Sequence, residues 1–373
     1  MRIPSRVLLN LSKNSQEFSH VEPIRHIPVM AKEITHALSP EDGQNFIDLT
    51  FGGGGHTKHL LATNKKINVY CLDRDPEAFQ RAIILAKSLK EKNNGQQIVP
   101  LLGRFSDLST LLNNWNVSKN FFDGAIMDLG ASSFQLEDKT KGFSVRSDSF
   151  LDMRMDGNRF PNMPTAADVV NCLDADDLTK IFKFYGEERH SRKIAQAIID
   201  ARFMMKSFNT TRELATLVEN VVDTERSDQI GRKAHSATKI FQALRIFVNN
   251  ELNEINYGVK IVGEYLKTFP KNEFEKSGKS FTSSIDQTTR GGLLAAISFH
   301  SLEDKIIKNH FMGHSHSTSR LEMDIEHPLH KLNELSSDKK WKFVGEPIIY
   351  PSENEVFFNP KARSAKLRIG MRI

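Results

Sequence analysis

The chain of 373 residues has no apolar run that approaches the roughly 20 residues of a membrane helix, and it has only two cysteines. Cys71 and Cys172 lie far apart, in ordinary apolar contexts and without metal-ligand spacing. The sequence therefore predicts no membrane partner, no disulfide framework and no metal site, and it favours a reducing compartment. The net charge of +5 and the pI near 9.0 are compatible with a polyanionic partner.

Acidic residues are missing from the start of the chain. Arg2, Arg6 and Lys13 all precede the first acidic residue, Glu17. This composition is typical of a mitochondrial transit peptide, and a disordered N-terminus is the alternative interpretation. We therefore expect residues 1–25 to form a separate targeting or disordered segment. The expected location is the mitochondrial matrix, with the cytoplasm as the alternative.

Strand-like and helix-like segments alternate from about residue 45 onward. The strand-like runs are Phe46–Phe51, Asn68–Asp73, Gln97–Leu102 and Gly124–Leu129. Helical patterns follow the first three, at His56–Ala62, Glu77–Glu91 and Asp107–Trp115. This alternation predicts an α/β fold with a parallel sheet and crossover helices, and strands that are apolar throughout indicate burial on both faces.

The alternation of strands and helices stops between residues 136 and 235, where we expect helices and no strand. The helical stretches are Ala166–Leu173, Asp176–Tyr185, Ser191–Met205 and Thr210–Val222. The segment Ser236–Ile255 is strongly amphipathic and is interpreted as the return into the core. Strand patterns resume at Gly292–Phe299, Lys342–Ile349 and Ala365–Met371. The expected units are thus 26–135, a helical insertion over 136–235, and 236–373, with polar loops near 270–291 and 313–340.

Four consecutive glycines, Gly52–Gly55, follow the first strand, where α/β sheets bind cofactors. His56 and Thr57 come next, so the Gly-Lys-Ser/Thr of a phosphate-binding P-loop is absent. The third small residue of a dinucleotide loop is also missing. S-adenosylmethionine needs no such residue, and Asp73 follows the loop by about 20 residues, where an acid binds ribose hydroxyls. These features leave both S-adenosylmethionine and NAD open.

Nine short motifs occur in a recognisable order along the chain. They are His26–Met30, Asp48–Thr57, Leu72–Pro76, Asp128–Leu136, Gly142–Asp156, Tyr185–Ala195, Phe241–Leu252, Ser298–Lys308 and Asn359–Arg368. Together they resemble the RsmH family, also called MraW. The resemblance implies a Rossmann-like class I methyltransferase sheet interrupted by an all-helical insertion domain. It also implies N4-methylation of a cytidine in small-subunit ribosomal RNA, with S-adenosyl-L-methionine as cofactor.

The resemblance also implies site residues. By motif, Gly54, Gly55 and His56 would contact the methionine part of the cofactor, and Asp73 the ribose. The remaining residues of the expected cofactor pocket are Phe105, Asp128 and Gln135. The basic N-terminal extension and the polar loop near residues 277–289 indicate a eukaryotic, mitochondrial member. The expected partner is then mitochondrial small-subunit ribosomal RNA or an immature small subunit. An NAD-dependent oxidoreductase and a non-catalytic RNA-binding assembly factor are the alternatives.

Asp128 is the catalytic candidate, because it ends the fourth strand, where this architecture places groups that face the substrate. The residues after it contain neither Pro-Pro nor an adjacent aromatic residue, unlike many amino-methyltransferases. Asp128 and the following carbonyls are expected to accept hydrogen bonds from the amine, and Phe134 or Phe143 to stack on the base. The expected contacts to the RNA backbone are Arg189, Arg192, Lys193, Arg363, Lys366 and Arg368. Alternatively, Arg363 and Arg368 brace the last strand.

Overall fold

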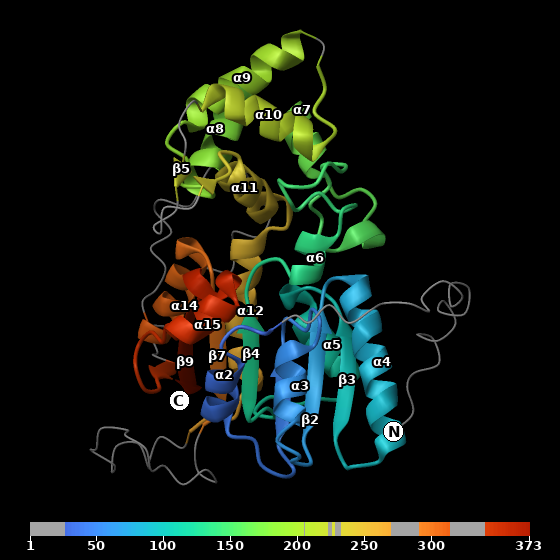
Figure 1. Ribbon diagram of the computed structural model, residues 1–373. Helices are drawn as coiled ribbons and strands as arrows, with labels where there is room; N and C mark the ends of the chain where they lie inside the picture. The colour runs from blue at the N-terminus through green and yellow to red at the C-terminus, as the bar shows by residue number, and fades with distance from the viewer. Residues whose placement is uncertain (1–26, 205, 223–225, 228–232, 270–290, 314–339) are drawn as a thin grey trace.

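The computed structural model describes residues 27–204, 206–222, 226–227, 233–269, 291–313 and 340–373 (Figure 1). The expected targeting segment, residues 1–25, and most of both polar loops lie outside the described residues. Among the helices of the described ranges, none is long and apolar enough to cross a membrane.

A sheet of seven strands has the order β3-β2-β1-β4-β7-β9-β8. Its strands are β1 (Asn45–Asp48), β2 (Asn68–Asp73), β3 (Gln97–Leu102), β4 (Gly124–Asp128), β7 (Leu293–Ser298), β8 (Trp341–Phe343) and β9 (Lys366–Arg372). The first five in this spatial order run parallel, and β9 lies antiparallel to both β7 and β8. The predicted Rossmann-like sheet is confirmed, with each of the first four strands within three residues of its expected bounds.

Successive strand residues face opposite sides of the sheet, so Phe46 and Ile47 enter two different cores. One core is completed by α2 (Ala31–Leu38), α3 (Gly55–Leu61) and α4 (Pro76–Lys92). The other is completed by α5 (Leu108–Asn114), α12 (Glu251–Tyr265) and α14 (Ser301–Met312). Helices on both faces leave the carboxyl ends of the parallel strands as the exposed edge.

A separate helical unit lies beyond that edge (Figure 1). It comprises α7 (Ala166–Cys172), α8 (Ala175–Phe184), α9 (Ser191–Phe203), α10 (Thr211–Val221) and α11 (Thr238–Val248), which share one apolar core. Side-chain caps set the first residues of α7, α8 and α10. Contrary to the expectation of no strand here, β5 (Arg226–Ser227) and β6 (Lys233–Ala234) form a short antiparallel pair.

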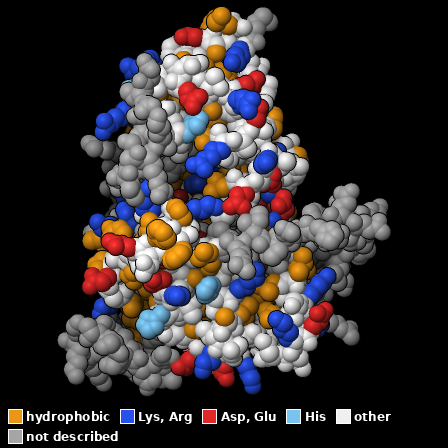
Figure 2. Space-filling view, viewed as in Figure 1, with side chains coloured by type: hydrophobic (Ala, Val, Ile, Leu, Met, Phe, Trp, Pro, Cys, Tyr) orange, Lys and Arg blue, Asp and Glu red, His pale blue; other side chains and the backbone are white. Residues whose placement is uncertain are grey.

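The amphipathic segment Ser236–Ile255 is two helices, which corrects its interpretation as a single return into the sheet core. Asn250 has a φ of 51° and separates α11 from α12. The apolar stripe of α11 packs within the helical unit, whereas α12 packs on the sheet. The helices that share the insertion's core therefore extend to Val248, and the expected boundary at 235 falls inside this packing unit. In Figure 2, basic and acidic side chains are interspersed over the visible face of the helical unit.

Candidate active site

A cavity of about 370 Å³ opens at the carboxyl ends of the parallel strands. The loops after β1, β2, β3, β4 and β7 all contribute to its wall, together with the start of α12. Open α/β sheets bind their ligands at this edge, where neighbouring strands end together. The volume is within the range of small-molecule sites, and both cofactor and substrate groups can be sought among its lining residues.

Close packing and backbone conformation both require glycine in the loop after β1. Gly54 has a φ of 73°, and a Cβ there would lie 2.7 Å from the ring of Phe51. Gly53 lies directly against the ring of Phe134. Gly52, Gly53 and Gly55 line the cavity, whereas Gly54 does not. Gly54 forms the turn that begins α3, and its contact with the cofactor stays a prediction.

Asp73 anchors the glycine loop to the end of β2. Its carboxylate accepts hydrogen bonds from the backbone N–H of Gly52 at 2.7 Å and of Asp75 at 2.9 Å. Burial raises the pKa of Asp73 to about 6, although the two N–H groups partly offset this effect. Asp73 lines the cavity, and each of its carboxylate oxygens has a second lone pair that can accept a further hydrogen bond.

His56 and Asp128 face each other across the cavity wall. His56 Nε2 lies 3.3 Å from Asp128 Oδ2, and the backbone N–H of Asp128 donates to Thr50 Oγ1 at 2.7 Å. Burial opposes the charged form of His56, but the bond to Asp128 outweighs it, and the pKa of His56 is raised. His56 Nδ1 and Asp128 Oδ1 are both buried without a hydrogen-bond partner. The pair therefore presents one unpartnered nitrogen and one unpartnered oxygen.

Phe105 and Gln135 also line the cavity, and each is held by distant parts of the chain. Phe105 packs on Gly258 of α12, where a Cβ would lie 3.1 Å from its ring. Gln135 donates to Asp75 Oδ2 at 3.0 Å and accepts from the Ser132 N–H at 3.0 Å. Both polar atoms of the Gln135 amide thus have protein partners, so this side chain shapes the wall of the cavity.

One charged cluster in the wall, formed by Arg245, Glu251 and Glu303, was not identified from the sequence. Arg245 pairs with Glu251 at 2.8 and 3.0 Å, and its Nη2 lies 3.6 Å from Glu303 Oε1. Burial raises the pKa of Glu303 to about 7, because Arg245 offsets the burial only in part and Glu251 adds repulsion. All three belong to motifs on which the family resemblance is based, and these motifs could have identified them as site residues.

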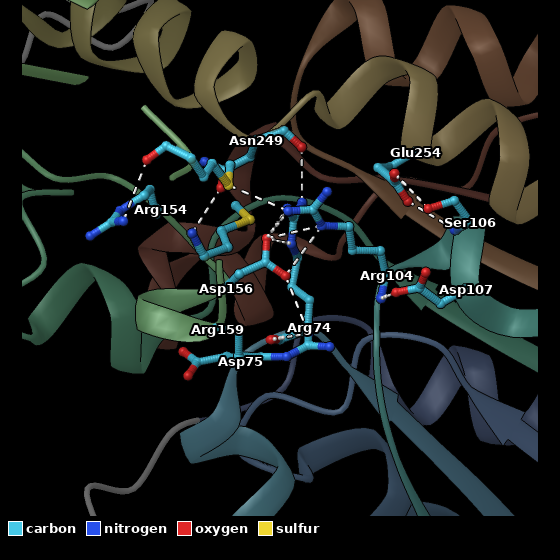
Figure 3. A network of polar contacts seen from close by, with 12 residues as sticks. Arg74, Asp75, Arg104, Ser106, Asp107, Arg154, Asp156, Arg159, Asn249 and Glu254 are labelled. Atoms are coloured by element: carbon cyan, nitrogen blue, oxygen red, sulfur yellow. Dashed lines mark hydrogen bonds and ion pairs between the residues drawn. The ribbon is translucent and has the colours of Figure 1, made fainter. Parts of the chain in front are cut away.

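A second charged cluster fixes the rim of the cavity to the segment that leads into the helical unit (Figure 3). Asp156 is fully buried and pairs with Arg74, Arg104 and Arg159. Burial alone would raise the pKa of Asp156, but Arg74 and Arg104 outweigh it and lower that pKa. Arg74 also donates to the carbonyl of Asn249 at 2.9 Å, between α11 and α12. The cluster therefore joins β2, β3 and both ends of the helical insertion.

Several further predicted residues lie away from the cavity or are buried. Phe143 belongs to the core of the helical unit, so its stacking role is corrected, whereas Phe134 lines the cavity. Arg368 is 3% exposed and pairs with Asp304 at 2.7 Å, and Lys366 approaches the same acid at 3.4 Å. Arg368 therefore braces β9, as the alternative interpretation states, and cannot contact RNA. The exposed candidates are Arg189, Arg192, Lys193 and Arg363.

The family model described as the MraW methylase family matches residues 23–271 and 267–373. The chain belongs to the MraW methylase family.

Relatives of this MraW family member are similar over most of their length. The human 12S rRNA N(4)-cytidine methyltransferase METTL15 is 42% identical, over 93% of this chain and 83% of its own. Its mouse counterpart is 41% identical, over 93% of this chain and 82% of its own. The bacterial ribosomal RNA small subunit methyltransferase H of Methylorubrum populi is 37% identical, over 95% of this chain and 89% of its own. The resemblance inferred from the nine motifs is thereby confirmed.

Proposed function

We propose that this protein transfers a methyl group from S-adenosyl-L-methionine to the N4 amine of a cytidine in small-subunit ribosomal RNA. The observation that carries the proposal is the cavity at the strand ends, where the glycine loop, Asp73 and the His56–Asp128 pair meet. Membership of the MraW methylase family and the activities named for its relatives support the same reaction. The family and the relatives give no support to an NAD-dependent oxidoreductase.

The residues present fit this cofactor. The bare main chain of Gly52 and Gly53 permits close approach, and Asp73 offers lone pairs to ribose hydroxyls. The ring of Phe105 forms an apolar wall for the adenine, and His56 presents its unpartnered Nδ1 to the methionine part. When bound, the cofactor supplies a methyl group already activated as a sulfonium.

Asp128 is proposed to act on the amine. The lone pair of a cytosine N4 amine is delocalised into the ring, so the amine is a poor nucleophile. A carboxylate that accepts one of its hydrogens stabilises the localised lone pair as the new bond forms. The buried Oδ1 of Asp128 is available for this bond, and Phe134, which lines the same cavity, is available to stack on the base.

The proposed substrate is the ribosomal RNA of the mitochondrial small subunit, within an immature particle in the mitochondrial matrix. The support is the 12S rRNA named for the human and mouse relatives and the basic start of the chain. Arg189, Arg192 and Lys193 are exposed near the start of α9. These side chains are proposed to contact the RNA backbone, because phosphate contacts position a protein on RNA independently of sequence.

The decisive experiment is nucleoside mass spectrometry of small-subunit ribosomal RNA after incubation with the purified protein and the cofactor. N4-methylcytidine at a single position is expected. RNA binding without methylation, on free RNA and on immature particles alike, would establish the alternative of a non-catalytic assembly factor.

Two variants then separate binding from chemistry. Asp73→Ala is expected to weaken cofactor binding in calorimetry by about 1.5–3 kcal/mol, the cost of losing hydrogen bonds to a charged group. Asp128→Asn is expected to lower the single-turnover rate at saturating cofactor by about 100-fold. If raising the cofactor concentration restores the full rate of Asp128→Asn, Asp128 only binds and its catalytic role is wrong.

A further inference from the structure

Unpartnered buried polar atoms are concentrated at the cavity. In the described part of the chain, five buried side-chain nitrogen or oxygen atoms lack a hydrogen-bond partner. Three of them, His56 Nδ1, Asp128 Oδ1 and Glu303 Oε1, belong to residues that line this one cavity. Because buried polar atoms nearly always have partners, such a cluster marks where ligand atoms complete the bonding. The proposed function employs the first two and leaves Glu303 without a role.

Glu303 is held rigidly by one oxygen only. Its Oε2 accepts hydrogen bonds from the backbone N–H groups of Phe299 at 2.9 Å and His300 at 3.1 Å, at the start of α14. The side chain is 1% exposed. Its Oε1 makes no hydrogen bond, and Arg245 Nη2 lies 3.6 Å from it. The cap thus fixes the carboxylate and leaves the second oxygen available.

Titratable neighbours of Glu303 come from α11, from α12 and from the start of α14. Arg245 of α11 attracts it, Glu251 at the start of α12 repels it, and His300 lies beside it at the start of α14. Arg245 already makes two bonds to Glu251. Its guanidinium also lies 3.6 Å from the Cβ position of Gly130, two residues after Asp128. Arg245 therefore links the Glu303 side of the cavity to the loop that follows β4.

We propose that Glu303 is a catalytic residue that accepts the proton released by the cytosine amine. This inference rests on the proposed function. Transfer forms a bond between N4 and the methyl carbon, while the carbon–sulfur bond of the donor breaks and its electron pair stays on sulfur. N4 then carries an extra proton, which passes to Glu303 Oε1, and the resulting carboxylic acid later releases it to water. A pKa of about 7 suits a group that must both take up and return a proton near neutral pH.

The amine has two hydrogens, and the cavity contains two carboxylates that can each accept one of them. Glutamate and aspartate are suitable partners for cytosine N4, because this group presents only hydrogen-bond donors. Asp128 is paired with His56 and orients one hydrogen, whereas Glu303 lacks a hydrogen bond at Oε1 and takes the other.

The test is Glu303→Gln, which keeps the oxygen that caps α14 and removes the proton acceptor. The matched control is Glu213→Gln. Glu213 also caps its own helix, accepting from Asn209 and Thr210 at 2.8 and 2.9 Å, and does not line the cavity. Single-turnover methyl transfer is measured from pH 5 to 9 at saturating cofactor and RNA. Cofactor affinity and thermal unfolding are measured on the same proteins. Carboxyl ¹³C NMR of the cofactor-free protein follows protonation of Glu303 independently of activity.

We expect the wild-type rate to rise with pH through about 7, and a glutamate signal to titrate in the same range. Glu303→Gln should lose both features and transfer methyl about 100-fold more slowly, with unchanged cofactor affinity, whereas Glu213→Gln should behave as wild type. A wild-type rate that does not depend on pH through this range overturns the proposal even if the variant fails to fold. Equal rates for both variants overturn it while the proposed function stands. A wild-type protein that methylates no cytidine overturns both.

Discussion

Two buried acids near the cavity have opposite charge balance. Asp156 is surrounded by three arginines, whereas Glu303 has one arginine, which Glu251 also engages. Both lose solvation by burial, but the arginines hold the pKa of Asp156 below its usual range and the pKa of Glu303 rises to about 7. The number of opposing charges thus decides whether a buried carboxylate becomes a permanent anchor or a group that exchanges protons near neutral pH.

The largest effect is expected from Asp156→Ala, which leaves three arginines together without their common partner. Removing one member of a buried ion cluster costs about 3–5 kcal/mol, because the remaining charges stay poorly solvated. Urea unfolding measures this free energy. Asp148→Ala is the control in the same segment. Its pair with Arg212 is exposed and 3.6 Å long, so its loss should cost less than about 1 kcal/mol. A similar small loss for Asp156→Ala would show that the cluster is no anchor.

Glu303 and Asp156 should contribute to the free energy of unfolding over different pH ranges. The folded pKa of Glu303 lies above its usual value of 4.5, so its favourable contribution is complete below pH 4.5 and is lost as the pH rises through about 7. For Asp156 the folded pKa is lowered, so its contribution is lost only as the pH falls below about 4.

Glu303→Gln is therefore expected to gain stability relative to wild type as the pH rises from 5 to 8, by about 2 kcal/mol. Unfolding in urea at a series of pH values measures the difference. A constant difference across this range would contradict the buried, proton-exchanging state of Glu303.

A smaller effect is expected from Glu251→Gln. This change removes a negative charge near Glu303, so that its surroundings become more positive, as those of Asp156 are. Removing the charge of Glu251 ends its repulsion of Glu303 and leaves Arg245 with a single carboxylate partner. The pKa of Glu303 should then fall by about one unit, as measured by carboxyl NMR titration. An unchanged or higher pKa would show that burial alone sets the protonation of Glu303.

The smallest effects concern cations without a buried partner. Replacing Arg192 or Lys193 with alanine should weaken RNA binding slightly and reduce the salt dependence of log K by about 0.7 per lost contact. Arg368→Ala is the contrasting variant, because Arg368 is buried against Asp304 and should affect stability instead. Filter binding over a range of salt concentrations and urea unfolding separate the two. Equal salt slopes for wild type and the α9 variants would exclude this surface from the RNA contact.

The parallel strands and the cofactor side of the cavity were predictable from the sequence, because their determinants are local, whereas the β5–β6 pair and the break at Asn250 were not. Four glycines after a buried strand, and Asp73 at the end of the next strand, place a ligand at one sheet edge by the geometry of parallel strands. Six of the seven expected cofactor residues line the cavity, and Gly54 is the exception because its conformation serves the turn. The helical pattern at Thr210–Val222 likewise predicted α10, and a capping box of Thr210 and Glu213 sets its first residue.

The tertiary structure alone decided which charged residues meet. Arg368 lies among apolar and basic residues near the C-terminal end of the chain. The sequence around it does not indicate that it pairs with Asp304. Arg74 and Asp156 are far apart in the chain, as are Arg245 and Glu303, so their pairing depends on how the helical unit joins the sheet. The charge state of a buried acid depends on all its neighbours in space, because desolvation and Coulomb interactions act through space and not along the chain. The sequence thus determined where the cofactor cavity forms, and the tertiary structure decided which acid in it carries a proton near neutral pH.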